Sequence, residues 1–196
     1  MSFFKKIFNF SSETFEEKTA KKQEVHLSLD DSFVHYFLKK GGKFLYCTQK
    51  EEITTHLQNI IKENNWKELI CTDPKLTAYL KETDIEIKTD LNYSAPFLTP
   101  CEHLIADNGD VLFSSNQLKS KKIVSLSDNF IVFATTSQLV KNTGQGLTGI
   151  KTNFKGNIPT NISSVKNYTI NKNEDNFLNY SNSNSKNLYL LLFENL

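Results

Sequence analysis

A strand, a polar helix start and an amphipathic helix occur twice in succession between residues 43 and 81. The first unit is KFLYC followed by TQKE and by a helix to about Asn64, with apolar residues at helical spacing. The second is ELIC followed by Thr72, Asp73 and Pro74, where proline takes the first position of a helix to about Lys81. Successive units of this kind place their strands parallel, with right-handed crossovers. This pattern constrains the fold most, and it predicts an α/β protein.

Three further apolar runs complete the predicted sheet, at residues 85–87, 130–134 and 188–193. The unbroken run at 130–134 is typical of a strand that is covered on both faces. The chain is therefore predicted to form a mostly parallel sheet with helices on both faces. The polar segment 171–186, rich in Asn and Ser, is predicted to be a loop.

Helix boundaries follow from capping residues. Asp30 or Asp31 is predicted to cap a helix that ends at Gly41, where glycine allows the left-handed stop. Residues 48–51 have the spacing of a capping box. A later helix is predicted to begin at Thr135 or Thr136 and to continue through residues 139–140.

The chain divides into an N-terminal segment, residues 1–24, and an α/β domain, residues 25–196. Phe3, Phe4, Ile7 and Phe8 fall on one face of a helical wheel, so the segment is predicted to be an amphipathic helix followed by a charged linker. Such a helix packs back on the domain, or it contacts a membrane surface or a protein partner. The sequence leaves these alternatives open.

Charge and cysteine spacing exclude several classes of function. The formal charge is +1, which gives no electrostatic reason for a nucleic-acid partner, and all 23 basic residues are lysines. The three cysteines lack the spacing of a compact zinc or iron–sulfur motif, and their thiols are predicted to be reduced and buried. No metal or other cofactor is expected. No run of eighteen apolar residues occurs, and we expect a cytoplasmic location.

Residues 144–149 spell GQGLTG, a literal GxGxxG. A dinucleotide site needs these glycines between the end of a strand and the start of a helix, with an acidic residue about twenty positions later. The predicted strand ends near Ala134, a helical stretch intervenes, and no such acidic residue follows. We therefore interpret the glycines as loosening or ending a helix.

The segment CEHLIADNGDVLFSS, residues 101–115, gathers a thiol, carboxylates and an imidazole. Asn108 and Gly109 are the favoured pair for a two-residue type I′ turn, so strands are predicted at 101–106 and 111–115. Alternation places Glu102 and His103 on opposite faces, and Cys101, His103 and residue 105 together. A thiol–imidazole pair, or a cation held by Asp107 and Asp110, are the alternatives to a purely structural hairpin.

The stretch HLIADNGDVL, residues 103–112, resembles the segment A-(E/D)-(T/S)-G-(T/S)-hydrophobic of the LUD domain, the lactate-utilisation family. IVFA followed by SQLV, at 131–140, is similar to the family's next strand and helix, and LYLLL near the C-terminus is similar to its last strand. The resemblance implies a fold like that of ribose-5-phosphate isomerase and CoA-transferases. It also implies an association with the oxidation of lactate to pyruvate. A late family segment rich in Ser, Arg, Asp, Glu and Gly has no counterpart in 155–187.

Three functions follow from these observations. The first is an accessory or binding protein for a small organic acid or phosphorylated ligand, with no complete catalytic centre of its own. The second is an enzyme of the same superfamily that acts on a small anionic metabolite, and the third is an interaction protein held by its aromatic N-terminus. No catalytic residue is assigned. The candidate ligand-binding residues are Glu102, His103, Asp107, Asn108, Gly109 and Asp110, and the candidate anion-binding residues are Lys121 and Lys122.

Overall fold

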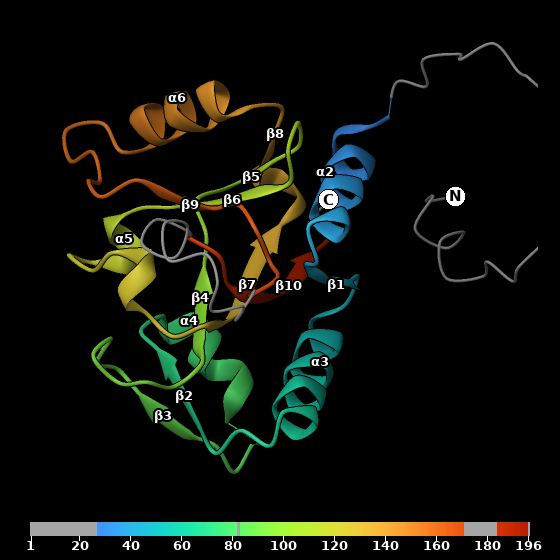
Figure 1. Cartoon of the computed structure of the whole chain (residues 1–196), viewed down its shortest axis with the longest axis vertical. Helices are drawn as coiled ribbons and strands as arrows, with labels where there is room; N and C mark the ends of the chain where they lie inside the picture. The colour runs from blue at the N-terminus through green and yellow to red at the C-terminus, as the bar shows by residue number, and fades with distance from the viewer. Residues whose placement is uncertain (1–26, 82, 171–183, 196) are drawn as a thin grey trace, which may run out of the picture.

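The computed structural model describes residues 27–81, 83–170 and 184–195 (Figure 1). The predicted N-terminal helix, residues 1–24, and most of the predicted loop 171–186 lie outside the described residues. The helices are α2 (Leu29–Lys39), α3 (Lys50–Glu63), α4 (Pro74–Thr77), α5 (Ser115–Leu118) and α6 (Thr143–Asn153), with 3-10 turns η1 (Ala78–Leu80), η2 (Ile123–Ser125) and η3 (Thr136–Gln138). No helix in the described part of the chain is long and apolar enough to cross a lipid bilayer.

The central sheet has six strands in the order β1-β10-β7-β4-β2-β3, and every neighbouring pair is parallel. The prediction of a parallel sheet is confirmed. The two strands of the repeated unit are not neighbours, however, because β10, β7 and β4 lie between them. The strands are β1 (Lys43–Cys47), β2 (Glu68–Cys71), β3 (Glu86–Lys88), β4 (Phe97–Pro100), β7 (Asn129–Thr135) and β10 (Asn187–Phe193).

Helices cover both faces of this sheet, as predicted. Along β10, Tyr189 and Leu191 point to the core beneath α3 and α4, while the alternate residues Leu188, Leu190 and Leu192 point to the other core. That second face is covered by α2 and by a second sheet (Figure 1). The alternation explains why the strand sequence is apolar without interruption.

The second sheet has four strands in the order β8-β5-β6-β9 and carries the predicted hairpin. Its strands are β5 (His103–Ile105), β6 (Asp110–Phe113), β8 (Leu139–Val140) and β9 (Ser163–Val165). The outer face of this sheet packs against α6 through Ile105, Leu112 and Ile150. The protein is therefore layered, with α3 and α4 on one side, two sheets stacked in the middle, and α6 on the other side (Figure 1).

The predicted two-residue turn of the hairpin is wrong. Ile105 pairs with Asp110, so four residues, 106–109, connect the strands, and the returning strand ends at Phe113. A type I′ turn needs positive φ at both central residues, but only Gly109 has it, at 70°. The Gly109 amide donates to the Ile105 carbonyl at 2.8 Å, which closes the wider turn.

The helix starts lie within one to three residues of the predicted ones. Ser28, not Asp30 or Asp31, caps α2, and its hydroxyl accepts from the Asp31 amide at 3.3 Å. At the start of α3 the capping carboxylate is Glu52, which accepts from the amides of Thr48 and Gln49 at 2.6 and 3.0 Å. The proline-initiated helix and the left-handed stop at Gly41 are confirmed.

The predicted helix through residues 139–140 is wrong, because those residues form β8 and pair in parallel with β5. The glycines at 144–149 do not end a helix. They lie inside α6, which begins at Thr143 and is capped by the Asn142 side chain. A Cβ at Gly146 would lie 3.3 Å from both Ile105 and Leu112, so glycine at this position lets the helix sit close on the sheet.

Candidate functional site at the carboxyl edge

The connections that follow β2 and β4 leave the central sheet on opposite faces. After β2 the chain enters α4, whose Leu76 packs in the core beneath α3, whereas after β4 it enters the hairpin on the other face. Ligands of open α/β sheets bind outside the carboxyl ends of the strands at such a switch point. The residues just beyond β2, β4 and β7 are therefore the first place to look for a functional site.

The Glu102 carboxylate is held by three side chains at this edge. It follows β4, and its Oε1 accepts hydrogen bonds from Ser114 Oγ at 2.6 Å, Asn116 Nδ2 at 2.8 Å and Gln117 Nε2 at 3.1 Å. Among the described residues, none donates a hydrogen bond to the other oxygen, Oε2. The carboxylate is half-buried, so one oxygen is fixed by the protein while the other remains available.

The donors to Glu102 are fixed by a capping box at the start of α5. The Ser114 amide donates to Gln117 Oε1 at 2.9 Å, and the Ser114 hydroxyl accepts from the Asn116 amide at 3.1 Å. Ser114 is buried, which limits its movement. Ser114-x-x-Gln117 has the spacing of a capping box and signals this helix start in the sequence, whereas the predicted strand 111–115 runs through it.

Gln138 joins the ends of β4 and β7. Its Nε2 donates to the carbonyl oxygens of Cys101 and Glu102 at 2.5 and 3.2 Å, and its Oε1 accepts from the Thr135 amide at 2.8 Å. Sequence reasoning missed Gln138, although Thr135-x-x-Gln138 is again a capping-box spacing. The amide fixes the backbone that carries Glu102.

Hydroxyl and amide groups extend this edge across β7 and β10. Asn195 Oδ1 accepts from the Ser137 amide at 3.1 Å and from Thr136 Oγ1 at 2.9 Å, and Asn195 Nδ2 donates to Ser137 Oγ at 3.0 Å. Thr135 Oγ1 lies 2.9 Å from Ser137 Oγ. These groups are neutral hydrogen-bond donors and acceptors that lie next to the Gln138 contact.

The β1 end of the same edge is acidic. Burial and a hydrogen bond with Glu194 raise the pKa of Tyr46, and the charge of Asp30 adds to the rise. On the other side of the edge, Asp73 Oδ1 accepts hydrogen bonds from the backbone amides of Lys75 and Leu76 at the start of α4. The ionisable groups in these contacts are carboxyl groups and a phenol, which accept hydrogen bonds from hydroxyl groups more readily than they attract an anion.

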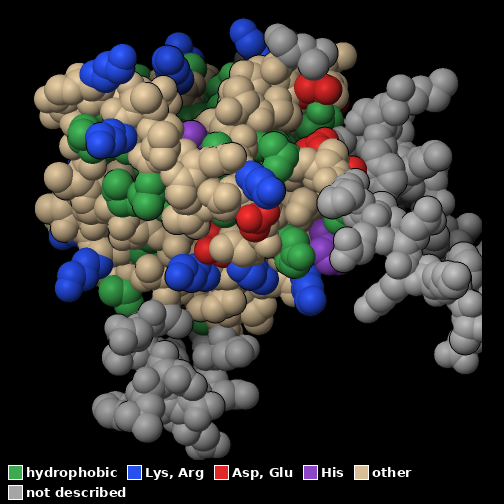
Figure 2. All heavy atoms as spheres, turned by 90° about the horizontal axis from the view of Figure 1, so that it is seen from above, with side chains coloured by type: hydrophobic (Ala, Val, Ile, Leu, Met, Phe, Trp, Pro, Cys, Tyr) green, Lys and Arg blue, Asp and Glu red, His purple; other side chains and the backbone are tan. Residues whose placement is uncertain are grey.

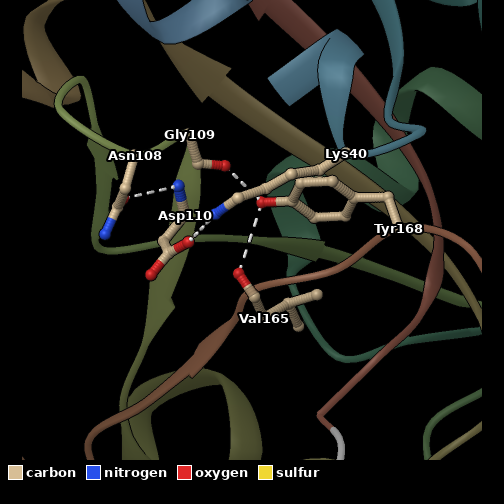
Figure 3. A network of polar contacts seen from close by, with 6 residues as sticks. All are labelled: Lys40, Asn108, Gly109, Asp110, Val165 and Tyr168. Carbon is tan, nitrogen blue, oxygen red and sulfur yellow. Dashed lines mark hydrogen bonds and ion pairs between the residues drawn. The ribbon is translucent and has the colours of Figure 1, made fainter. Parts of the chain in front are cut away.

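The predicted hairpin residues occupy a different place, beneath the end of α2. Asp110 is buried and pairs with Lys40 at 2.7 Å, and the Asp110 amide donates to Asn108 Oδ1 at 3.0 Å. The Tyr168 hydroxyl donates to the Gly109 carbonyl at 2.5 Å (Figure 3). Asp107 is exposed at the tip. This network connects distant parts of the chain and holds the largely buried Asp110 carboxylate against Lys40.

The remaining candidates are also dispersed. The side chain of His103 faces Gly149 of α6, and its Nδ1 lies 3.2 Å from the Gln138 carbonyl of η3. Cys101 packs in the core on the other face of the hairpin sheet. Lys121 donates to the Asn92 side chain, and Lys122 is exposed at the start of η2. The structure thus separates the predicted ligand-binding residues: Glu102 lies at the carboxyl edge with His103 beside Gln138, whereas residues 107–110 lie beneath the end of α2.

On the face that Figure 2 shows, which is the α6 side of Figure 1, lysine side chains are spread singly with hydrophobic side chains between them. This distribution is unlike the continuous basic surface of proteins that bind nucleic acid. Among the described residues, no group of three or more His, Cys, Asp or Glu side chains is placed to hold a metal ion.

The fold and the site geometry define a class of protein: a layered α/β protein with a polar edge at the carboxyl ends of its parallel strands. The family model of the LUD domain matches residues 31–193, and the chain belongs to this family. The fold is similar to the crystal structure of a DUF162 family protein from Deinococcus radiodurans, with a TM-score of 0.60 and 13% identity over 85% of this chain and 99% of that chain. No curated protein matches the sequence.

Proposed function

We propose that this LUD-domain protein is an accessory protein that binds a small hydroxylated organic acid at the carboxyl edge, with Glu102 as the acceptor for the ligand's hydroxyl. The observation that carries the proposal is the asymmetry of this carboxylate. Three donors hold Oε1, and no described residue donates to Oε2. A half-buried oxygen that is fixed in position and has no protein donor is suited to a hydroxyl group of a ligand.

The acid group of such a ligand needs donors, and the chain has no arginine to supply a bidentate clamp. The hydroxyls of Thr135 and Ser137 and the amide of Asn195 supply neutral donors near Gln138 instead. The resemblance to lactate-utilisation proteins makes lactate the first hydroxy acid to test. The wider class includes glycolate, glycerate and malate.

The test compares ligands that differ by one hydroxyl. Binding of L-lactate, D-lactate, propionate and pyruvate to the whole chain is measured by thermal shift and by calorimetry. A hydroxy acid is expected to raise the melting temperature more than propionate, which lacks the hydroxyl, and Glu102→Gln is expected to abolish that difference. Glu51→Gln, an exposed change in α3, is the matched control. Equal responses to lactate and propionate, or silence with every hydroxy acid, would refute the proposal.

The alternative function is the enzyme of the second hypothesis, in which Glu102 Oε2 would act as the general base. The two functions differ in whether the ligand is consumed. If the protein is an accessory binder, the NMR spectrum of a bound hydroxy acid stays unchanged during long incubation. Conversion by the native chain that is lost in Glu102→Gln would establish the enzyme.

The third hypothesis, attachment through the aromatic N-terminus, concerns residues 1–24, which lie outside the described residues. It stays a prediction with a direct test. Deletion of residues 1–12 is expected to abolish sedimentation with anionic lipid vesicles if this segment is the anchor, whereas sedimentation that persists would exclude it.

A further inference from the structure

A cavity of about 300 Å³ lies at the opposite end of the central sheet from Glu102. Its walls come from the end of α3, from Lys67 just before β2, and from residues just before β3. In Figure 1 this region is at the bottom, away from the hairpin sheet and α6. The volume is at the lower end of the range for small-molecule sites, roughly 300–1,000 Å³.

The residues at the C-terminal end of α3 form one wall of this cavity. The Asn65 amide donates to the Lys62 carbonyl and the Trp66 amide donates to the Ile61 carbonyl, with Asn65 at a φ of 54°. This is the Schellman arrangement, in which the residue after the turn packs on the last turn of the helix. The Trp66 ring also meets the Tyr189 ring edge to face, with centroids 6.3 Å apart. The indole is therefore held in place before any ligand arrives.

The cavity combines an apolar floor with a charged rim. Ile61, Trp66 and Ile85 pack at the margin of the core beneath α3 and remain half-buried, so their outer surfaces line the space. Lys62 and Lys67 are exposed at the rim. Within the described parts of the chain, no carboxylate lies within ion-pair distance of either ammonium group, so both charges face solvent and the cavity.

We propose that this cavity binds a small aromatic carboxylate. The ring packs against Trp66, Ile61 and Ile85, and the carboxylate lies between the two lysines. Bare phosphate would leave the apolar floor in water. A cationic ring would meet two ammonium groups against one carboxylate, that of Asp84, among the described lining residues. An aromatic ring with one negative group satisfies both parts of the cavity. This site is separate from the one proposed for the hydroxy acid.

Trp66 is the single tryptophan of the chain, so its fluorescence reports on this cavity alone. With excitation at a wavelength that tryptophan alone absorbs, the intact protein is titrated with four probes. Phenylacetate carries ring and charge, phenylacetamide the ring without charge, phenethylamine the opposite charge, and acetate the charge without ring. Phenylacetate is expected to change the emission saturably and at lower concentration than the other three.

Charge-removing variants test the role of the rim. Lys62→Gln and Lys67→Gln are each expected to weaken phenylacetate binding about two- to fivefold, the effect of an exposed charge pair, and to leave phenylacetamide unchanged. Lys75→Gln, an exposed lysine of α4 outside the cavity, is the matched control. Equal affinity for phenylacetate and phenylacetamide, or no saturable change with phenylacetate, would overturn the proposal. Glu102→Gln is expected to leave these titrations unchanged, which separates this test from that of the proposed function.

Discussion

The Lys40 ammonium nitrogen lies 2.7 Å from Asp110 Oδ1, and this pair ties the end of α2 to the first residue of β6. The contact belongs to a wider junction. The Tyr168 amide donates to the Lys40 carbonyl at 3.1 Å, while the Tyr168 hydroxyl donates to the Gly109 carbonyl (Figure 3). Three segments that are far apart in the sequence meet here. The hairpin tip is consequently an anchor for the fold.

The Lys40–Asp110 pair is expected to contribute to stability, because Asp110 is buried and Lys40 is only partly exposed. A double-mutant cycle with Lys40→Met and Asp110→Asn should give a coupling energy of about 0.5–2 kcal/mol from urea denaturation. The pair Lys88–Glu86, whose glutamate is exposed, provides the control. Its cycle, with Lys88→Met and Glu86→Gln, should give less than about 0.5 kcal/mol. Equal coupling in the two cycles would contradict this account.

Gly109→Ala is expected to destabilise the protein by about 2–4 kcal/mol, because two costs combine there. The position has a φ of 70°, and an added Cβ would lie 2.5 Å from the Phe37 amide nitrogen of α2. Gly156→Ala separates the two costs. Its φ is 88°, but a Cβ there meets nothing within 4 Å, so only about 1 kcal/mol of backbone strain is expected. Thermal unfolding of the two variants measures the difference, and similar losses would show that the contact with α2 is unimportant.

The three cysteines are expected to resist thiol reagents in the folded protein. All three are buried, and burial raises the pKa of the Cys47 thiol to about 12, with a further contribution from the charge of Glu52. Burial raises the pKa values of Cys71 and Cys101 as well. At pH 8 the reactive thiolate is therefore scarce. Labelling by a chromogenic disulfide should be slow in buffer and complete within minutes in denaturant. Rapid labelling of any one thiol in buffer would contradict the prediction.

Lys186 is a buried lysine, with 2% of its side chain exposed, and its ammonium donates to the Leu126 carbonyl at 2.9 Å. Burial lowers its pKa, although the nearby Asp128 partly offsets this. Between the lowered pKa and about 10.5, the unfolded chain holds more protons on this group than the folded chain. The free energy of unfolding should therefore rise with pH through this window.

Lys186→Met tests this linkage, because methionine keeps most of the volume and removes the titrating group. The variant is expected to lose about 1 kcal/mol at pH 7 through the broken hydrogen bond. Its stability relative to the native chain should then fall further as pH rises from 8 to 10. Urea denaturation followed by circular dichroism at each pH measures the difference. A difference that does not change with pH would exclude a lowered pKa at Lys186.

The candidate site could be predicted only in part. The sequence predicts Glu102 as a ligand-binding residue, and it predicts residues 107–110 as well. Those four residues are near Glu102 in the sequence but do not lie at the same edge of the fold. The donors that fix Glu102 are twelve to fifteen residues away in the chain, and they reach it because the hairpin folds back on β4. Residues that are close in the sequence therefore suggested one binding cluster, but the pairing of β5 with β6 places them at different parts of the fold.

The sequence by itself determined the parallel α/β fold, five of the six strands of the central sheet and most helix starts, because local periodicity and capping depend on neighbouring residues; β4 is the strand of that sheet that it did not predict. Only the tertiary structure decided that Leu139–Val140 is a strand, since its pairing partner β5 lies about 35 residues earlier. The same holds for Lys186, a charged residue in a polar segment whose ammonium is buried because β10 runs between β1 and β7. Pairing and burial between distant segments depend on free energies summed over the whole core, which no short stretch of sequence contains.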